Sequence, residues 1–162
     1  MSAGVTDWRA MARRWIADPL EGTATWLLFH GMRRLSLDQA SALGGKVARW
    51  LGPRLAVSKR ARRNLRRCFP TWSAAEIEAV VAEVWENLGR TAGEFPNSAA
   101  ITVGGPDARV ELVGQEHLEA ALAEEGPAIF FSAHLANWEV LPLTAQERGI
   151  PITQVYRGFN TP

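Results

Sequence analysis

Residues 126–139 read GPAIFFSAHLANWE, and this stretch decides the fold that we expect. Within it, AIFFS at residues 128–132 is a continuous apolar run of strand length, and a histidine follows closely. Such runs are typical of parallel strands that are buried on both faces. A helix is predicted next, from near Asn137 to Arg148, and Gly149 closes it. The stretch therefore predicts a strand, a turn and a helix of a parallel α/β sheet.

Two flanking runs extend this pattern. Residues 110–113 and 152–156 read as strands, and residues 115–125 read as a helix. We therefore expect a partial parallel β-α-β sheet behind a helical N-terminal layer. The sequence stops directly after the last predicted strand, so we expect one incomplete, truncated domain that is unstable and inactive in isolation. Such a sheet lacks apolar cover, and this predicts partly exposed side chains for Phe130, Phe131, Ile152 and Val155.

The first ninety residues read as helices. Two capping boxes predict helix starts, because a serine is followed three residues later by Gln or Glu. The pairs are Ser36 with Gln39 and Ser73 with Glu76. Gly52-Pro53 ends the first of these helices, and a further helix from about Leu55 to Cys68 ends before Phe69-Pro70. We expect Trp50, Trp85 and the single cysteine, Cys68, to be buried.

Charge is divided unevenly along the chain. Residues 1–75 hold fourteen Lys or Arg and four Asp or Glu, whereas residues 76–162 hold four and thirteen. The net charge of +1 hides this division. A field of one sign favours an anionic partner, either nucleic acid or anionic lipid. The alternative is a solvated helix face whose charges pair with the acidic half.

Five of the seven tryptophans precede residue 75, alongside the arginines. Tryptophan and arginine together suit a membrane interface. No stretch reaches the run of about 20 apolar residues that a spanning helix needs. We therefore expect the chain to lie on a membrane surface, peripherally or weakly anchored.

The polar residues that follow the apolar run carry the candidate chemistry. His134 lies on the predicted turn and Glu139 in the next helix, so their side chains are able to meet in a cleft at the carboxyl end of the strand. The pKa of histidine lies near neutrality, which suits a general base. Glu139 would orient the imidazole and stabilise its protonated form. Asn137 is a good helix cap. A structural, hydrogen-bonded histidine is the alternative interpretation.

Three motifs in order resemble the bacterial lipid A biosynthesis acyltransferases, the lauroyl and myristoyl transferases of the lysophospholipid acyltransferase superfamily. The resemblance covers the N-terminal part of that family only. The motifs are His134-x4-Glu139 in HLANWE, Arg63-Asn64-Leu65 with Cys68-Phe69-Pro70, and Val155-Tyr156-Arg157 with Asn160 and Pro162. The resemblance implies an acyltransferase-type sheet, with residues 1–105 as a helical, basic, membrane-facing part and residues 106–162 as the first part of the catalytic core.

The resemblance also implies an activity. Such O-acyltransferases move a fatty acyl chain from a thioester carrier, usually acyl carrier protein, to a hydroxyl of a lipid A precursor. His134 would deprotonate that hydroxyl with the support of Glu139, and neither a metal nor another cofactor is expected. Further implied residues are Asn137, Trp138 and Arg157 for the substrate, and Arg62, Arg63, Arg66 and Arg67 for the membrane or another anionic partner.

The resemblance further implies a place at the cytoplasmic face of the bacterial inner membrane. The competing hypothesis is a non-enzymatic basic module that binds anionic membrane or nucleic acid. No recognised nucleic-acid motif is present, so a nucleic-acid partner is not expected.

Overall fold

The computed structural model describes residues 18–124, 126–133, 135–153 and 155. The chain divides after Ser98 into two compact units, here called the N-terminal unit and the C-terminal unit. The described helices are α2 (Asp18–Met32), α3 (Leu37–Leu51), η2 (Gly52–Arg54), α4 (Ser58–Cys68), α5 (Ala74–Glu94), η3 (Phe95–Ala100), α6 (Gln115–Ala123) and α7 (Val140–Glu147). Among these described helices, none is long and apolar enough to cross a membrane.

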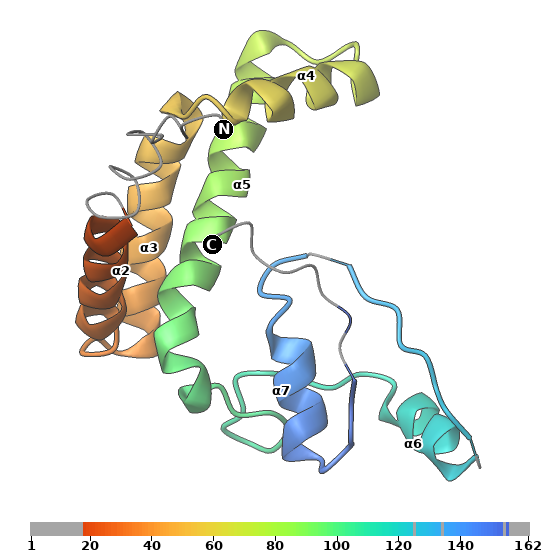
Figure 1. The fold of residues 1–162 in the computed structure, drawn as a ribbon. Helices are drawn as coiled ribbons and strands as arrows, with labels where there is room; N and C mark the ends of the chain where they lie inside the picture. The colour runs from red at the N-terminus through yellow and green to blue at the C-terminus, as the bar shows by residue number, and fades with distance from the viewer. Residues whose placement is uncertain (1–17, 125, 134, 154, 156–162) are drawn as a thin grey trace, which may run out of the picture. The chain divides into compact units, whose positions relative to one another are not determined.

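Helices α3 and α5 form the centre of the N-terminal unit and lie side by side (Figure 1). Their seam is made of small residues that recur every four positions. A Cβ atom added to Gly44 or Gly89 would overlap the backbone of the other glycine, and one added to Gly93 would overlap the carbonyl of Ala40. The two backbones therefore approach each other closely, and only glycine fits at these positions. Val81 and Ile77 of α5 are buried.

Polar side chains beside this seam form hydrogen bonds between α3 and α5. The Ser41 hydroxyl donates to Glu94 at 2.7 Å. Arg49 donates to Glu86 at 2.9 Å, and Arg90 of the same helix as Glu86 donates to the other carboxylate oxygen at 2.6 Å. Of these contacts, the Arg49–Glu86 ion pair joins the basic half of the sequence to the acidic half. The alternative of paired charges therefore holds for Arg49.

A buried hydroxyl holds α4 against the rest of the unit. Ser58, at the start of α4, is 1% exposed. Its Oγ donates to the carbonyl of Gly52 at 2.6 Å and accepts the indole N–H of Trp85 at 2.8 Å. One small side chain thus satisfies polar groups of η2 and α5 together.

Replacing Ser58 by alanine should lower the free energy of unfolding by about 2 kcal/mol, because the Gly52 carbonyl and the Trp85 N–H lose their partner in a buried site. Urea unfolding followed by tryptophan emission measures this change. The control is Ser98→Ala, at a half-buried serine of η3 whose side chain forms no hydrogen bond with the described residues. Equal unfolding midpoints for the two variants would contradict the assigned role of Ser58.

The local helix predictions are confirmed. Both capping boxes form, with Ser36 and Ser73 as the N-caps of α3 and α5. Helix α4 ends at Cys68 as expected, although it begins at Ser58 rather than near Leu55.

The expected burial of two side chains is wrong. Trp50 is 65% exposed and Cys68 is exposed, because the faces of α3 and α4 that carry them lie away from the helix contacts. Trp85, half-buried against Ser58, fits its prediction in part.

The predicted parallel β-α-β sheet is wrong. The described residues of the C-terminal unit form no strand, and the one β-type pairing is an isolated bridge between Val103 and Val110. Residues 126–133 have no ladder partners among the described residues. An apolar run becomes a strand only when neighbouring strands accept its backbone hydrogen bonds, and this run has none. The predicted exposure is confirmed for Phe130 (57%), Phe131 (93%), Ile152 (44%) and Val155 (99%).

Candidate functional site

The turn that leads into α7 carries the candidate carboxylate. Glu139 is the N-cap residue of α7 and is half-buried. Its backbone N–H donates to the Asn137 side-chain oxygen at 3.2 Å. The prediction that Asn137 itself caps the helix is therefore wrong by two residues, although its side chain does order the turn. Pro142 lies in the first turn of α7, where its missing N–H costs no helical hydrogen bond.

A sharp turn precedes this carboxylate. Ala136 has a φ of +48°, a left-handed conformation that non-glycine residues seldom adopt. Two of the predicted substrate residues, Asn137 and Trp138, directly precede Glu139 in the same turn. Both are half-buried. A carboxylate at the first turn of a helix lies in the favourable field of the free N–H groups there.

Two of the predicted site residues, His134 and Arg157, lie outside the described residues. The pairing of the His134 ring with the Glu139 carboxylate stays a prediction. The structure brings together Asn137, Trp138 and Glu139.

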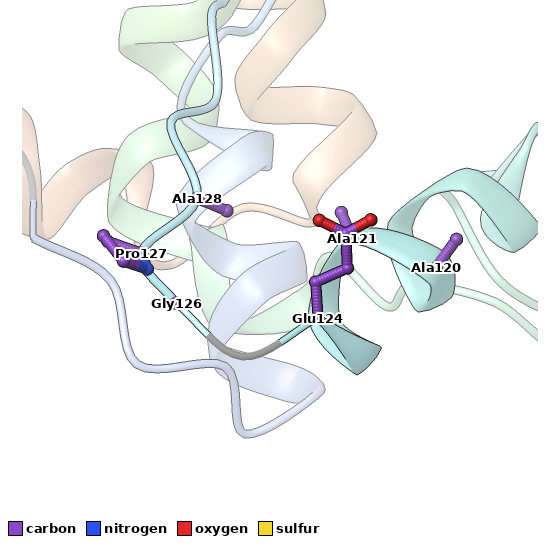
Figure 2. Close-up of a pocket in the computed structure, with 6 residues that line it drawn as sticks. All are labelled: Ala120, Ala121, Glu124, Gly126, Pro127 and Ala128. Carbon is purple, nitrogen blue, oxygen red and sulfur yellow. The ribbon is translucent and has the colours of Figure 1, made fainter.

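A shallow pocket lies elsewhere in the C-terminal unit. Figure 2 shows its lining, which comes from the end of α6 and the start of the apolar run: Ala120, Ala121, Glu124, Gly126, Pro127 and Ala128. Glu139, Asn137 and Trp138 do not line it. Among the described residues, its lining offers the carboxylate of Glu124 and small apolar groups, and it includes no histidine.

The four arginines predicted to meet an anionic partner differ in their surroundings. Arg62 forms a bidentate pair with Glu78 of α5, at 2.5 Å and 2.7 Å, and also donates to the Pro53 carbonyl at 2.8 Å. The other three, Arg63, Arg66 and Arg67, are exposed. The hydrogen bonds from Arg62 hold the pKa of Glu78 below its usual value, and Glu78 in turn raises the pKa of Arg62. Sequence reasoning missed this pair, since the partners lie sixteen residues apart.

Acid should destabilise the N-terminal unit. Hydrogen bonds from Ser73, Arg62 and Arg90 lower the pKa values of Glu76, Glu78 and Glu86, respectively. A carboxyl whose pKa is lower in the folded state stabilises the fold above its unfolded pKa, and this is lost as pH falls through the folded pKa.

The urea midpoint should therefore stay level between about pH 6 and 8 and fall below about pH 4.5, near the pKa of an unfolded glutamate. Urea titrations across this range, followed by circular dichroism, measure it. Glu78→Gln should reduce the fall of the urea midpoint in acid more than Glu83→Gln does. Glu83, an exposed glutamate of the same helix, is the control. A midpoint that rises on acidification would contradict the assignment.

Comparison with known proteins identifies relatives. A family model described as bacterial lipid A biosynthesis acyltransferase matches residues 9–162. A curated protein of Haemophilus influenzae, named lipid A biosynthesis acyltransferase, is 26% identical over 121 residues, which cover 74% of this chain. The chain spans 38% of the length of that relative. No solved structure matches the chain.

Proposed function

Since the chain belongs to the bacterial lipid A biosynthesis acyltransferase family, we propose that it acts in the transfer of a fatty acyl chain from a thioester carrier to a hydroxyl of a lipid A precursor. The observation that carries this proposal is the family match over residues 9–162, which includes the whole HLANWE segment. The name of the Haemophilus influenzae relative supports it. The acyl donor proposed is an acyl carrier protein, an acidic partner suited to the basic half of the chain.

The proposed chemistry is general-base catalysis. His134 takes the proton from the acceptor hydroxyl, and the hydroxyl oxygen attacks the thioester carbonyl carbon. The tetrahedral intermediate then breaks its carbon–sulfur bond, and the imidazolium returns the proton to the leaving thiolate. The products are an ester on the lipid and a free carrier thiol. Because one imidazole both accepts and returns the proton, the proposal requires neither a metal nor a covalent enzyme intermediate.

Glu139 is proposed to orient and stabilise the imidazolium, as the carboxylate of a catalytic triad does. Its half-buried place at the start of α7 supports this role, because burial strengthens its attraction for a nearby cation. Asn137 and Trp138, in the same turn, and Arg157 are proposed to contact the substrate.

The test is an acyl-transfer assay with the protein that carries this chain, an acyl carrier thioester and a lipid A precursor. We expect the mass of the precursor to rise by one acyl group while carrier thiol is released in equal amount. Release of thiol without acylated lipid would show hydrolysis instead and would contradict the proposed acceptor. Transfer to a precursor whose free hydroxyls are blocked would contradict the proposed ester chemistry.

A further inference from the structure

Helix α4 presents a row of cations on its outer face, here called the basic ridge: Lys59, Arg60, Arg63, Arg66 and Arg67. All five are exposed. At 100° and 1.5 Å per residue they cover roughly 120° of the helix and about 12 Å of its length. The buried and half-buried residues of the helix lie on the other side, and they are Ser58, Ala61, Arg62 and Leu65.

The basic ridge carries unneutralised charge. Within the described part of the chain, no carboxylate forms an ion pair with any of its five residues. The carboxylate of Glu78 is engaged by Arg62, although Arg66 also lies in its field. Five like charges on less than three turns repel one another, so an anionic partner lowers the free energy of this face.

Arg62 has a different role from the ridge. Its guanidinium binds Glu78 of α5 and the Pro53 carbonyl together, so it fixes α4 in its orientation. Ser58 anchors the same helix through Gly52 and Trp85. These two attachments hold the basic ridge outward on a rigid element before any partner arrives.

An aromatic pair closes the end of the ridge. Phe69 and Trp72 stack with their ring centroids 4.0 Å apart and their planes 8° from parallel. Phe69 is 42% exposed and directly follows the last turn of α4. Exposed aromatic rings beside Arg and Lys are typical of the level at which lipid headgroups meet acyl chains.

We propose that the basic ridge docks on the phosphate groups of an anionic phospholipid bilayer, with Phe69 entering the headgroup layer and Arg62 acting as a structural clamp rather than a lipid contact. A bilayer fits better than an acidic helix of a protein, because the cations spread across the helix as well as along it. A planar array of phosphates meets all five, whereas one row of carboxylates meets a single line. The inference rests on the proposed function only in placing the reaction at a lipid surface, and binding is measured without acyl transfer.

The experiment is co-sedimentation of the purified protein that carries this chain with phosphatidylcholine vesicles, with or without phosphatidylglycerol. We expect binding only to the anionic vesicles, with an affinity that falls steeply as salt rises. Arg63→Gln/Arg67→Gln should weaken binding about 30-fold, since each cation near the surface contributes about fivefold. The control variant Arg33→Gln/Arg34→Gln removes the same amount of charge, from the exposed turn after α2. It should weaken binding less than threefold, because charges away from the basic ridge are screened by salt.

A further double variant tests the structural role of Arg62. Arg62→Gln/Glu78→Gln removes the ion pair at constant net charge. It should lower the urea midpoint yet leave vesicle affinity within about twofold at temperatures where circular dichroism shows the helices intact. Under the same conditions, Arg63→Gln/Arg67→Gln should keep the parent urea midpoint.

Four results would overturn the proposal. The first is equal binding to neutral and anionic vesicles. The second is an equal loss of vesicle affinity for the Arg33/Arg34 and Arg63/Arg67 variants. The third is a loss of vesicle affinity for the Arg62/Glu78 variant while its helices remain intact. The fourth is tighter, ridge-dependent binding to acyl carrier protein or duplex DNA than to anionic vesicles at the same salt. Each outcome is readable when no acyl transfer is detected, so a failure here is distinct from a failure of the proposed activity.

Discussion

Replacing Gly89 by alanine is expected to destabilise the N-terminal unit by about 3 kcal/mol or more, and replacing it by leucine is expected to unfold that unit. Alanine normally stabilises a helix relative to glycine, by about 1 kcal/mol. At Gly89 the sign reverses, because a Cβ would overlap the Gly44 carbonyl oxygen and the Ala48 methyl group of α3. The backbone of α3 cannot yield as a flexible side chain can, so the two helices must separate.

Two other glycines supply matched controls for this result. Among the described residues, a Cβ added to Gly22 of α2 would meet no atom within 4 Å beyond the local helix backbone, so Gly22→Ala should stabilise by up to about 1 kcal/mol. At Gly45 an added Cβ meets the flexible side chains of Arg90 and Glu86, so alanine there should cost far less than at Gly89. Urea unfolding followed by circular dichroism ranks the three variants. A stabilising Gly89→Ala would show that α3 and α5 do not approach through this seam.

Replacing His134 by alanine is expected to lower kcat by about 10²–10⁴-fold in the protein that carries this chain, because the acceptor hydroxyl loses its general base. KM should change little, since the imidazole is proposed to act mainly in the transition state. Initial rates of acyl transfer, measured by the mass of the acylated lipid, give both constants.

The matched control is His117→Ala. His117 is exposed on α6 in the same unit, and kcat should keep its parent value when it is replaced. Glu139→Gln tests the supporting role, because it should lower kcat and shift the acidic limb of the pH–rate profile to lower pH as the imidazolium loses its stabilising charge. Full activity of His134→Ala would remove the histidine from the mechanism.

The features that the sequence predicted correctly are local ones. The bonds between Ser36 and Gln39, and between Ser73 and Glu76, join residues three positions apart, so their spacing alone is sufficient. The end of α4 before Phe69-Pro70 is similarly local. The family resemblance was also recognised correctly, because its motifs are short runs of sequence.

The features that failed depend on distant parts of the chain. The run at residues 128–132 has the composition of a buried strand, yet strand formation requires partners that the described residues do not provide. The exposure of Trp50 depends on which face of α3 meets α5. The small residues Ala40, Gly44 and Ala48, at four-residue spacing, mark the face of α3 that meets α5, and Trp50 lies off that face.

Of the candidate site, the sequence predicted Glu139 inside the helix, whereas the structure places it one residue before α7, as the N-cap residue. The sequence could not predict which arginines of α4 pair with a carboxylate and which stay exposed, because the Arg62–Glu78 pair exists only once α4 folds against α5. A count of charges treats all the arginines of α4 alike, whereas the packing of α4 against α5 distinguishes Arg62 from the exposed cations of the basic ridge.

The seam between α3 and α5 also determines how the N-terminal unit reaches its fold. Gly44 and Gly89 are separated by about 45 residues, so their meeting closes a long loop at an entropic cost of roughly 3 kcal/mol. That cost precedes any gain from close contact. The rate of folding should therefore depend on loop closure rather than on helix formation, and α4, which lies inside the loop, should become ordered only after the two glycines meet.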